Sequence, residues 1–267
     1  MKRLLVTGAA GGLGRMLRPR LTGLAEILRL SDIDDIVPAG EGEEVVHCDL
    51  SDRAATRKLV EGCEGIVHLG GQSVEADFDT ILQANLIGTY ALYEAARQAG
   101  TRRILFASSN HAIGFHTRET RLDAEAPLRP DSLYGVSKCY GEALARLYYD
   151  KFGIETAIVR IGSCFPEPKD HRMLATWLSP DDFVSLIERI FTVTRLGCPV
   201  IYGASANDEG WWDNRHVAYL GWHPQDNAET FRAALDAATE PPAADDPVAR
   251  YQGGGFAAAG HFEDKAE

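Results

Sequence analysis

The feature that most constrains the fold is a glycine-rich turn near the N-terminus. The run KRLLV, residues 2–6, predicts a strand, and TGAAGGLGRML after it places glycines at positions 8, 11 and 14. Glycine permits a tight turn and lets a ligand approach the free N–H groups of a following helix, which attract anions. In isolation such a triplet would fit an ordinary turn about as well. Directly after a strand, it predicts a dinucleotide-binding βα unit.

Short β-rich runs alternate with helical patterns along the first 161 residues, which is typical of a parallel sheet with crossover helices. We therefore predict an α/β, doubly wound parallel sheet of the Rossmann type with a small C-terminal substrate-binding part. The predicted strands, in spatial order 3-2-1-4-5-6, cover residues 2–6, 26–31, 44–48, 65–69, 103–107 and 155–161. Residues 1–161 are expected to form the cofactor domain with the catalytic residues, 162–239 a substrate-binding region integrated with it, and 240–267 a linker-like tail.

Composition narrows the possible partners. A chain of 267 residues that is 45% hydrophobic can bury a sizeable core. The formal net charge of −12 argues against nucleic acids and anionic membranes, and an acidic small substrate would need a cation in its own site. The five cysteines form no CxxC pair, which suits reduced thiols in the cytoplasm, and no apolar run suits a signal peptide or a membrane span. The histidines lack metal-ligand spacing, so no metal is expected.

Acidic residues follow the second and third predicted strands. Asp32 stands 18 residues after Gly14, where a carboxylate can accept both ribose hydroxyls of an adenosine and would repel the extra phosphate of NADP. This position favours NAD, although Asp32 capping a turn in the run DIDD is an alternative. Asp49 and Leu50 are expected either to flank an adenine ring or to form a turn and part of the core.

Small residues follow the fourth predicted strand. Gly70 and Gly71 leave room for a cofactor, because ligands of open α/β sheets bind beyond the carboxyl ends of the strands. Asn85 lies early in a helix predicted over 79–99. It is interpreted either as a solvent-facing residue or as a group that holds a proton-relaying water.

Tyr134 precedes Lys138 by four positions in LYGVSKCYGEALARLYY, which reads as one helix. An ammonium near a phenol favours the phenolate, so the pKa of the tyrosine is expected to fall from about 10 and the tyrosine to serve as a general base. Such a pair arises easily by chance, so its neighbours matter. The fifth strand ends in Ser108, Ser109 and then Asn110, and a hydroxyl there can bind the oxygen from which the tyrosine takes a proton. The long loop 112–131 after it favours a functional role.

Four motifs, TGAAGGLG, Asp32, SSNHAIG and YGVSK, occur in an order that resembles the short-chain dehydrogenase/reductase superfamily, in particular its extended, epimerase/dehydratase-like branch. The resemblance implies that Ser109, Tyr134 and Lys138 are catalytic, with Ser109 chosen because it stands five residues before Gly114. It also implies an NAD site made of Gly8, Gly11, Gly12, Leu13, Gly14, Asp32, Asp49, Leu50, Leu69, Gly70, Gly71, Asn85, Tyr134 and Lys138.

The remaining third of the chain is short for a member that holds a nucleotide sugar, which favours a smaller ligand. Residues 161–187 begin at the end of a strand and should lie over the crevice. They include Arg172, whose planar fork suits a carboxylate, although a surface arginine paired with a nearby aspartate is the alternative. Beyond them we predict a last strand in GCPVIYG and a helix over 228–238. Trp211 and Trp212 line the pocket or, as we favour, pack in the core, and YQGGGF docks on the body or on a neighbouring subunit.

Three segments, SSNHAIG, RIGSCFPEP with HRMLATW, and GASANDEGWWDN, together resemble uronate dehydrogenases, which oxidise glucuronate or galacturonate at the anomeric carbon with NAD. The resemblance implies a sugar acid as the substrate, an aldarolactone as the product and a homo-oligomer. It also implies substrate contacts from Ser73, Ser109, Asn110, His111, Tyr134, Ser163 and Arg172. Two alternatives stay open. One is a sugar epimerase or dehydratase that uses NAD transiently, and the other is a non-catalytic NAD-sensing regulator, which would be expected to lack the tyrosine and lysine.

Overall fold

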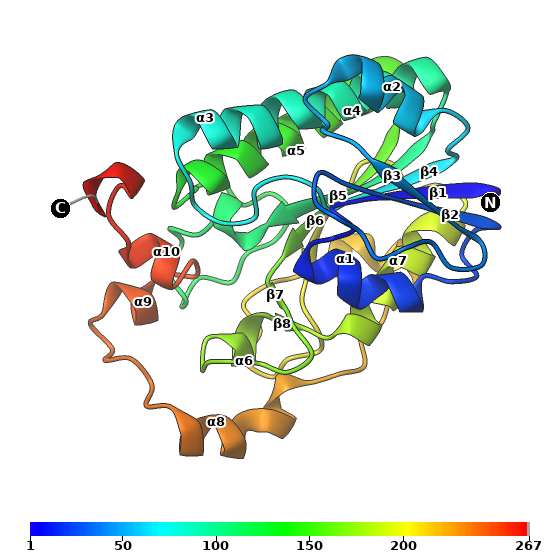
Figure 1. Cartoon of the computed structure of the whole chain (residues 1–267). Coiled ribbons are helices and arrows are strands. Elements are labelled where there is room, and N and C mark those ends of the chain that lie inside the picture. The colour runs from blue at the N-terminus through cyan, green and yellow to red at the C-terminus, as the bar shows by residue number, and fades with distance from the viewer. Residues whose placement is uncertain (266–267) are drawn as a thin grey trace.

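A seven-stranded parallel sheet forms the centre of the computed structural model, which describes residues 1–265 (Figure 1). Its order is β3-β2-β1-β4-β5-β6-β9, and every neighbouring pair runs parallel. The predicted order of the first six strands is confirmed, and β9, from the predicted last strand, adds beside β6. The bounds are β1 Arg3–Thr7, β2 Ile27–Asp32, β3 Glu43–His47, β4 Gly65–His68, β5 Arg103–Ser109, β6 Glu155–Ile161 and β9 Val200–Gly203.

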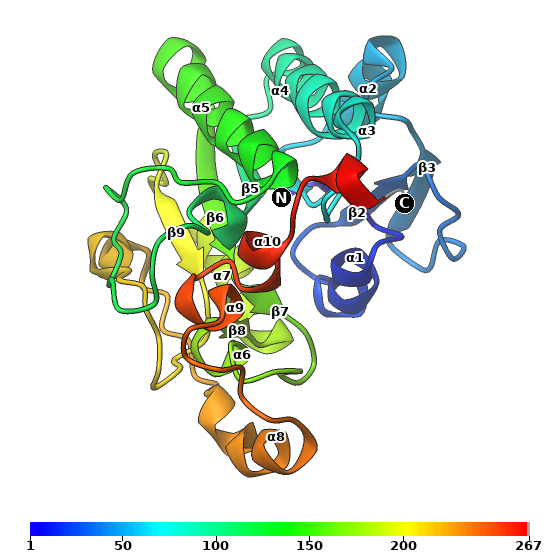
Figure 2. The same ribbon diagram turned by 90° about the vertical axis from the view of Figure 1, so that its left-hand side faces the viewer.

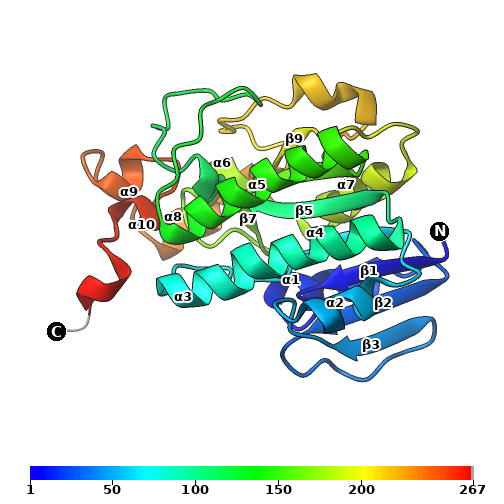
Figure 3. The ribbon, with the colours of Figure 1, turned by 90° about the horizontal axis from the view of Figure 1, so that it is seen from above.

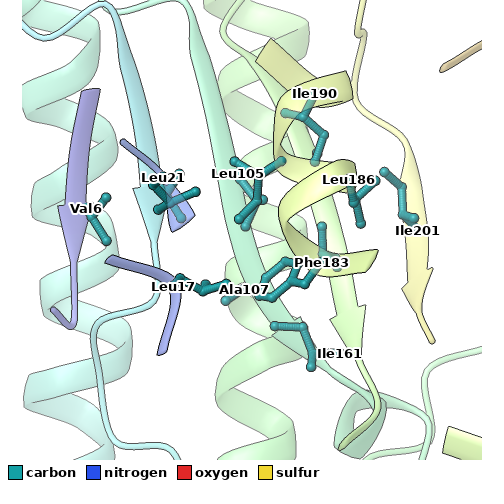
Figure 4. Packing of buried hydrophobic residues seen from close by; sticks show 14 of the residues in the cluster. Val6, Leu17, Leu21, Leu105, Ala107, Ile161, Phe183, Leu186, Ile190 and Ile201 are labelled. Atoms are coloured by element: carbon teal, nitrogen blue, oxygen red, sulfur yellow. The ribbon is translucent and has the colours of Figure 1, made fainter. Parts of the chain in front are cut away.

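Helices cover both faces of the sheet, as expected for strands buried on both sides. One face carries α2 (Arg53–Val60), α4 (Gly88–Ala99) and α5 (Leu133–Phe152), and the other carries α1 (Gly12–Leu17) and α7 (Pro180–Thr192) (Figures 1 and 3). Figure 4 shows the core on the second face, where Leu105 of β5 lies with Leu186 and Ile190 of α7. Helix α7 was not predicted. Its N-cap is Ser179, whose side chain accepts a hydrogen bond from the Asp182 N–H, and Pro180 stands in its first turn.

The helix predicted over 79–99 is interrupted. It consists of α3 (Phe78–Ile81), a π-helical turn over Leu82–Ile87, and α4. Asn85 lies in the π-helical turn and is 4% exposed, so the interpretation of Asn85 as a solvent-facing residue is wrong. π-Helical turns recur at functional sites. Here the wider turn directs the Asn85 side chain toward the loop after β4.

Small elements follow β6. They are β7 Ser163–Cys164, α6 Met173–Thr176 and β8 Trp177–Leu178, and, beyond α7 and β9, 3₁₀ turns at Arg215–Leu220 and Ala228–Phe231 and α8 Arg232–Ala238. The predicted helix over 228–238 is therefore confirmed as a 3₁₀ turn that continues into α8. In the preceding GASANDEGWWDN segment, Trp212 is half-buried and stacks on the fully buried Tyr202 at 5.2 Å between ring centroids, which agrees with a packing role.

The tail is linker-like only in its first part. Residues 240–245 are exposed, whereas α9 (Pro247–Arg250), α10 (Gly255–Ala258) and a 3₁₀ turn at Phe262–Lys265 follow. Figure 2 shows α9 and α10 beside the N-terminal end of α5, on the side where the strands end. YQGGGF thus docks on the body of its own chain. All five cysteines are free thiols, four of them buried, and no helix among the described residues is long and apolar enough to span a membrane.

Candidate active site

The glycine-rich turn leaves an open, uncapped helix N-terminus beyond β1. Gly8 has a φ of 73°, and a Cβ there would lie 2.7 Å from the Gly70 nitrogen, so the loops after β1 and β4 touch. At Gly14 a Cβ would meet the Gly8 carbonyl at 2.3 Å, whereas at Gly12 nothing lies within 4 Å. No side chain caps α1, whose N-cap is Gly11. The turn therefore fits a pyrophosphate that approaches the free N–H groups of Gly12 and Leu13.

Asp32 ends β2 beside this turn. Its Oδ2 accepts a 2.8 Å hydrogen bond from the Ala10 N–H, and its Oδ1 accepts one from the Ile33 N–H at 2.7 Å. The carboxylate is thus held at the edge of the glycine turn, where a ribose would lie. Asp49 Oδ1 accepts a hydrogen bond from the Ser51 N–H at 2.8 Å, and Leu50 packs on the apolar core. Of the two interpretations of this pair, these contacts agree with a turn residue and a core residue.

The loop after β4 is fastened by Asn85. Its Oδ1 accepts from the Gln72 N–H at 2.7 Å, and its Nδ2 donates to the Gln72 carbonyl at 3.0 Å and to Ser137 Oγ of α5 at 2.8 Å. Asn85 therefore ties the loop after β4, at Gln72, to the helix that carries the tyrosine. Ser73, in the same loop, is exposed.

Tyr134 and Lys138 are both buried in α5, with the Lys138 Nζ 5.3 Å from the centre of the tyrosine ring. The Nζ donates to the Ala107 carbonyl of β5 at 2.9 Å, and burial lowers the pKa of Lys138 to about 8. The expected fall in the pKa of Tyr134 is not found. Burial raises it to about 12, and the hydrogen bond with Ser109 only partly opposes this. Desolvation of a phenolate outweighs the other contributions here.

Arg172 joins the substrate residues expected after β5 and β6. The Asn110 amide donates to the Ile161 carbonyl at 3.1 Å, and its oxygen accepts from Arg172 Nη2 at 2.6 Å. Arg172 Nη1 donates to Ser163 Oγ at 3.4 Å. The structure therefore brings Asn110, Ser163 and Arg172 together. These hydrogen bonds do not agree with the alternative interpretation, a surface arginine paired with a nearby aspartate. Burial lowers the pKa of Arg172 to about 10, and the nearby carboxylates of Asp170 and Asp131 only partly oppose this.

Several residues of the site were not predicted. Glu75 accepts hydrogen bonds from the Leu133 and Tyr134 N–H groups, at 3.0 and 2.8 Å, and so fixes the start of α5. Asp131 binds His111, and Phe256 of α10 stacks on the same imidazole, with 3.8 Å between ring centroids. A carboxylate just before the N-cap serine of α5 was the available signal for Asp131. Phe256 offered none, because it meets His111 only in the folded chain.

A hollow of about 440 Å³ lies elsewhere, between the turn after α1 and the start of α7, and is lined by Arg20, Trp177, Asp181 and Asp226 among others. It contains none of the predicted site residues. The described residues also hold no group of three or more His, Cys, Asp or Glu side chains that suits a metal ion.

Comparison with known proteins identifies the relatives of this arrangement. Residues 4–180 match the NAD dependent epimerase/dehydratase family. The uronate dehydrogenase of Agrobacterium fabrum is 62% identical over 256 residues, which are 96% of this chain and 97% of that protein. A uronate dehydrogenase mutant from Agrobacterium tumefaciens complexed with NAD superposes with a TM-score of 0.97 at 61% identity, covering 98% of this chain and 99% of the other.

A second solved structure, a glucuronic acid dehydrogenase from Chromohalobacter salexigens, has the same TM-score of 0.97 at 59% identity and covers 98% of this chain and 99% of its own. These likenesses extend through the tail as well as the sheet. The chain belongs to the NAD dependent epimerase/dehydratase family and, within it, to the uronate dehydrogenases.

Proposed function

We propose that this chain oxidises a hexuronic acid, glucuronate or galacturonate, at the anomeric carbon with NAD and releases the aldarolactone. The observation that carries the proposal is Arg172, a half-buried arginine near the carboxyl ends of β5 and β6 that has no carboxylate among its hydrogen-bond partners in the described residues. The relatives of this chain that are named uronate dehydrogenases support the same substrate class.

The hydrogen bonds of Arg172 leave room for an acid. Its Nε donates to the Gln252 carbonyl at 2.7 Å, and one N–H on each terminal nitrogen is directed to Asn110 and Ser163. A guanidinium has five N–H groups, so one on each terminal nitrogen stays available. Two such groups match the two oxygens of a carboxylate. A bound carboxylate would also neutralise the positive charge of the Arg172 guanidinium, which the surrounding protein shields from water.

Tyr134 would act as the base at the other end of the sugar. It takes the proton of the anomeric hydroxyl while the hydride on the same carbon leaves for the cofactor, and the ring oxygen on that carbon makes the product an ester. The step removes two electrons and two hydrogens from the sugar and needs no water. When bound, NAD supplies the hydride acceptor and a cationic ring that favours a nearby phenolate. The cofactor would be held by the glycine-rich turn after β1, by Asp32 and by the loop after β4.

Ser109 and Lys138 would support the base. The Ser109 hydroxyl, which interacts with Tyr134, would orient the reacting oxygen. Lys138, held by the Ala107 carbonyl, lies close enough to the tyrosine ring to stabilise the phenolate and to bind the nicotinamide ribose. Asn110 and His111 would hold ring hydroxyls and so fix the anomeric hydrogen against the nicotinamide.

The test is direct. Purified protein is mixed with NAD and, in separate reactions, with glucuronate, galacturonate, glucose, galactose and nucleotide sugars. The formation of NADH is measured by its absorbance. We expect NADH only with the uronates. Absence of NADH with every uronate would reject the proposal. A sugar epimerase or dehydratase would instead convert a nucleotide sugar with no net NADH, and product analysis of the same reactions distinguishes it.

We also propose a homo-oligomer and a cytoplasmic location. Val136 and Leu147, 50% and 47% exposed, lie with Tyr140 and Ala143 along one stripe of α5, which suits contact with another copy. The five free thiols suit a reducing compartment. Light scattering of the purified protein and fractionation of the producing cells test the two statements.

A further inference from the structure

Asp131 holds His111 in one orientation. The Asp131 side chain is fully buried, and its two oxygens lie 2.8 and 3.1 Å from His111 Nδ1. Ser132 Oγ donates to the same carboxylate at 3.0 Å. Because a carboxylate only accepts hydrogen bonds, the imidazole proton is placed on Nδ1, and Nε2 of the neutral ring becomes an acceptor. His111 Nε2 has no hydrogen-bond partner among residues 1–265.

Asp131 also sits between two glycines from distant parts of the chain. A Cβ at Gly114 or at Gly253 would come within 1.8 Å of Asp131 Oδ2. The Gly253 N–H donates to the Gly114 carbonyl at 2.9 Å, which brings the two backbones together around the carboxylate. The Asp131 carboxylate thus packs between Gly114, in the loop after β5, and Gly253, in the tail. We call this packing site of Asp131 its seat.

The tail is attached to the loop after β5 from Val248 onward, since Arg118 donates hydrogen bonds to the carbonyls of Val248 and Arg250. Gln252 is completely buried, and its side chain donates to the Thr117 and Thr120 carbonyls at 3.0 and 2.9 Å and accepts from Trp212 at 2.8 Å. Its own carbonyl accepts the hydrogen bond from Arg172 Nε. The exposed residues 240–245 precede it. Attachment of the tail therefore begins at α9 and continues through Gln252 to Arg172.

Phe256 brings the tail to the tyrosine. Its ring stacks on His111 and lies 6.2 Å, centre to centre, from Tyr134, with which it shares an apolar cluster. The imidazole is held on one side by the Asp131 carboxylate and covered on one face by Phe256. Both contacts restrict the direction in which His111 Nε2 can meet a ligand.

We propose that Asp131 is a positioning residue for uronate oxidation, which directs His111 Nε2 to a sugar hydroxyl and, by packing against Gly253, helps to hold the tail segment whose Phe256 covers His111. The proposal rests on the proposed function. It assigns Asp131 no contact with the substrate, and its effect passes through His111 and the tail.

Gly253→Ala and Asp131→Asn perturb the seat from its two sides. We expect each to lower kcat/KM for glucuronate by roughly tenfold to a hundredfold, because small misplacements of a binding group have effects of this size. NAD affinity, measured by fluorescence, should stay within about twofold of the original protein's, since the glycine turn is untouched. Gly260→Ala is the matched control in the tail, since a Cβ there meets nothing within 4 Å. Equal kcat/KM for Gly253→Ala and Gly260→Ala would overturn the proposal.

A double-mutant cycle separates positioning from general damage. Added to His111→Ala, the Asp131→Asn change should lower kcat/KM by clearly less than it does in the original protein, because the part of its effect that passes through the imidazole is already lost and only the part that passes through the tail remains. Full additivity would overturn the proposal. If Asp131→Asn does not fold, the same cycle is made with Gly253→Ala.

The nitrogen NMR signals of His111, assigned by comparison with His111→Ala, give a readout that needs no turnover. We expect the proton on Nδ1 in the original protein, and a neutral His111 with its proton on Nε2 would overturn the proposal. A chain that oxidises no uronate but keeps the Nδ1 proton would reject the proposed function while leaving the Asp131–His111 arrangement in place.

Discussion

Arg172 Nε donates a 2.7 Å hydrogen bond to the backbone carbonyl of Gln252, 80 residues further along the chain. The same guanidinium reaches Asn110 after β5 and Ser163 in β7. Three separate segments therefore hold one cation. Since the guanidinium is already ordered, a carboxylate that binds to it loses less free energy to the ordering of side chains.

Arg172→Lys should lower kcat/KM for glucuronate by about a hundredfold, mainly through a higher KM. The lysine keeps a positive charge but cannot form two parallel hydrogen bonds, and a buried charged pair of this kind contributes about 2–5 kcal/mol. Arg215→Lys is the control, since the Arg215 side chain is 91% exposed and forms an ion pair with Asp213. Initial rates of NADH formation measure both variants, and similar losses for the two would contradict the carboxylate site.

Tyr134→Phe should lower kcat by roughly 10²- to 10⁴-fold, which is the usual contribution of a general base. NAD binding, followed by fluorescence quenching, should persist because the ring that lines the crevice is kept. Tyr140→Phe removes a hydroxyl from a half-buried position on the same helix and should leave kcat within about twofold. Retained turnover in Tyr134→Phe would identify another group as the base.

Lys138 should make the stability of the ligand-free protein depend on pH. Burial lowers the pKa of Lys138 from 10.5 to about 8, so between these values the unfolded chain holds a proton that the folded chain has released. The free energy of unfolding therefore rises with pH across this window. Below about pH 8 the buried charge costs on the order of 3 kcal/mol.

Lys138→Met removes that cost. At pH 7 the variant should be more stable than the original protein by up to about 3 kcal/mol, and its advantage should vanish near pH 10.5. Urea denaturation at pH 7, 8.5 and 10 measures the difference. A difference that does not change with pH would show that the Lys138 ammonium is not desolvated in the folded protein.

Asp32→Ala should weaken NAD binding about tenfold and permit reaction with NADP. The carboxylate at the end of β2 would accept hydrogen bonds from the ribose hydroxyls, and its negative charge would repel a phosphate there. Asp34→Ala removes an equal charge two residues away, where the side chain is exposed. The ratio of kcat/KM for NAD and NADP checks the prediction, which fails if both variants change this ratio equally.

The sheet and the cofactor side could be predicted because their signals are local. Short β-rich runs, glycines at fixed spacing and an aspartate at a strand end each lie within one short stretch of sequence. The Tyr134 and Lys138 spacing was equally local, and both residues lie in α5 as the pattern indicated.

The electrostatics of the site could not be predicted in the same way. The pKa of Tyr134 depends on how completely distant segments bury it, and Phe256 belongs to a segment more than a hundred residues away. The contact between Asp131 and Gly253 likewise could not be predicted from the sequence around either residue. The docking of YQGGGF on its own body was an open alternative for this reason, because only folding brings Gln252 to Arg172 and Trp212.

β9 places a limit on how this protein can be re-engineered. It lies within residues 162–239, the segment that we predict to bind the substrate, yet its residues pair with β6, from Ile158 with Val200 to Ile161 with Gly203. An exchange of residues 162–239 with those of a relative would therefore carry a strand of the sheet with it. A graft that omits this strand would leave β6 as an unpaired, apolar edge and favour aggregation. Chimaeras designed to change sugar preference need their second junction after Gly203.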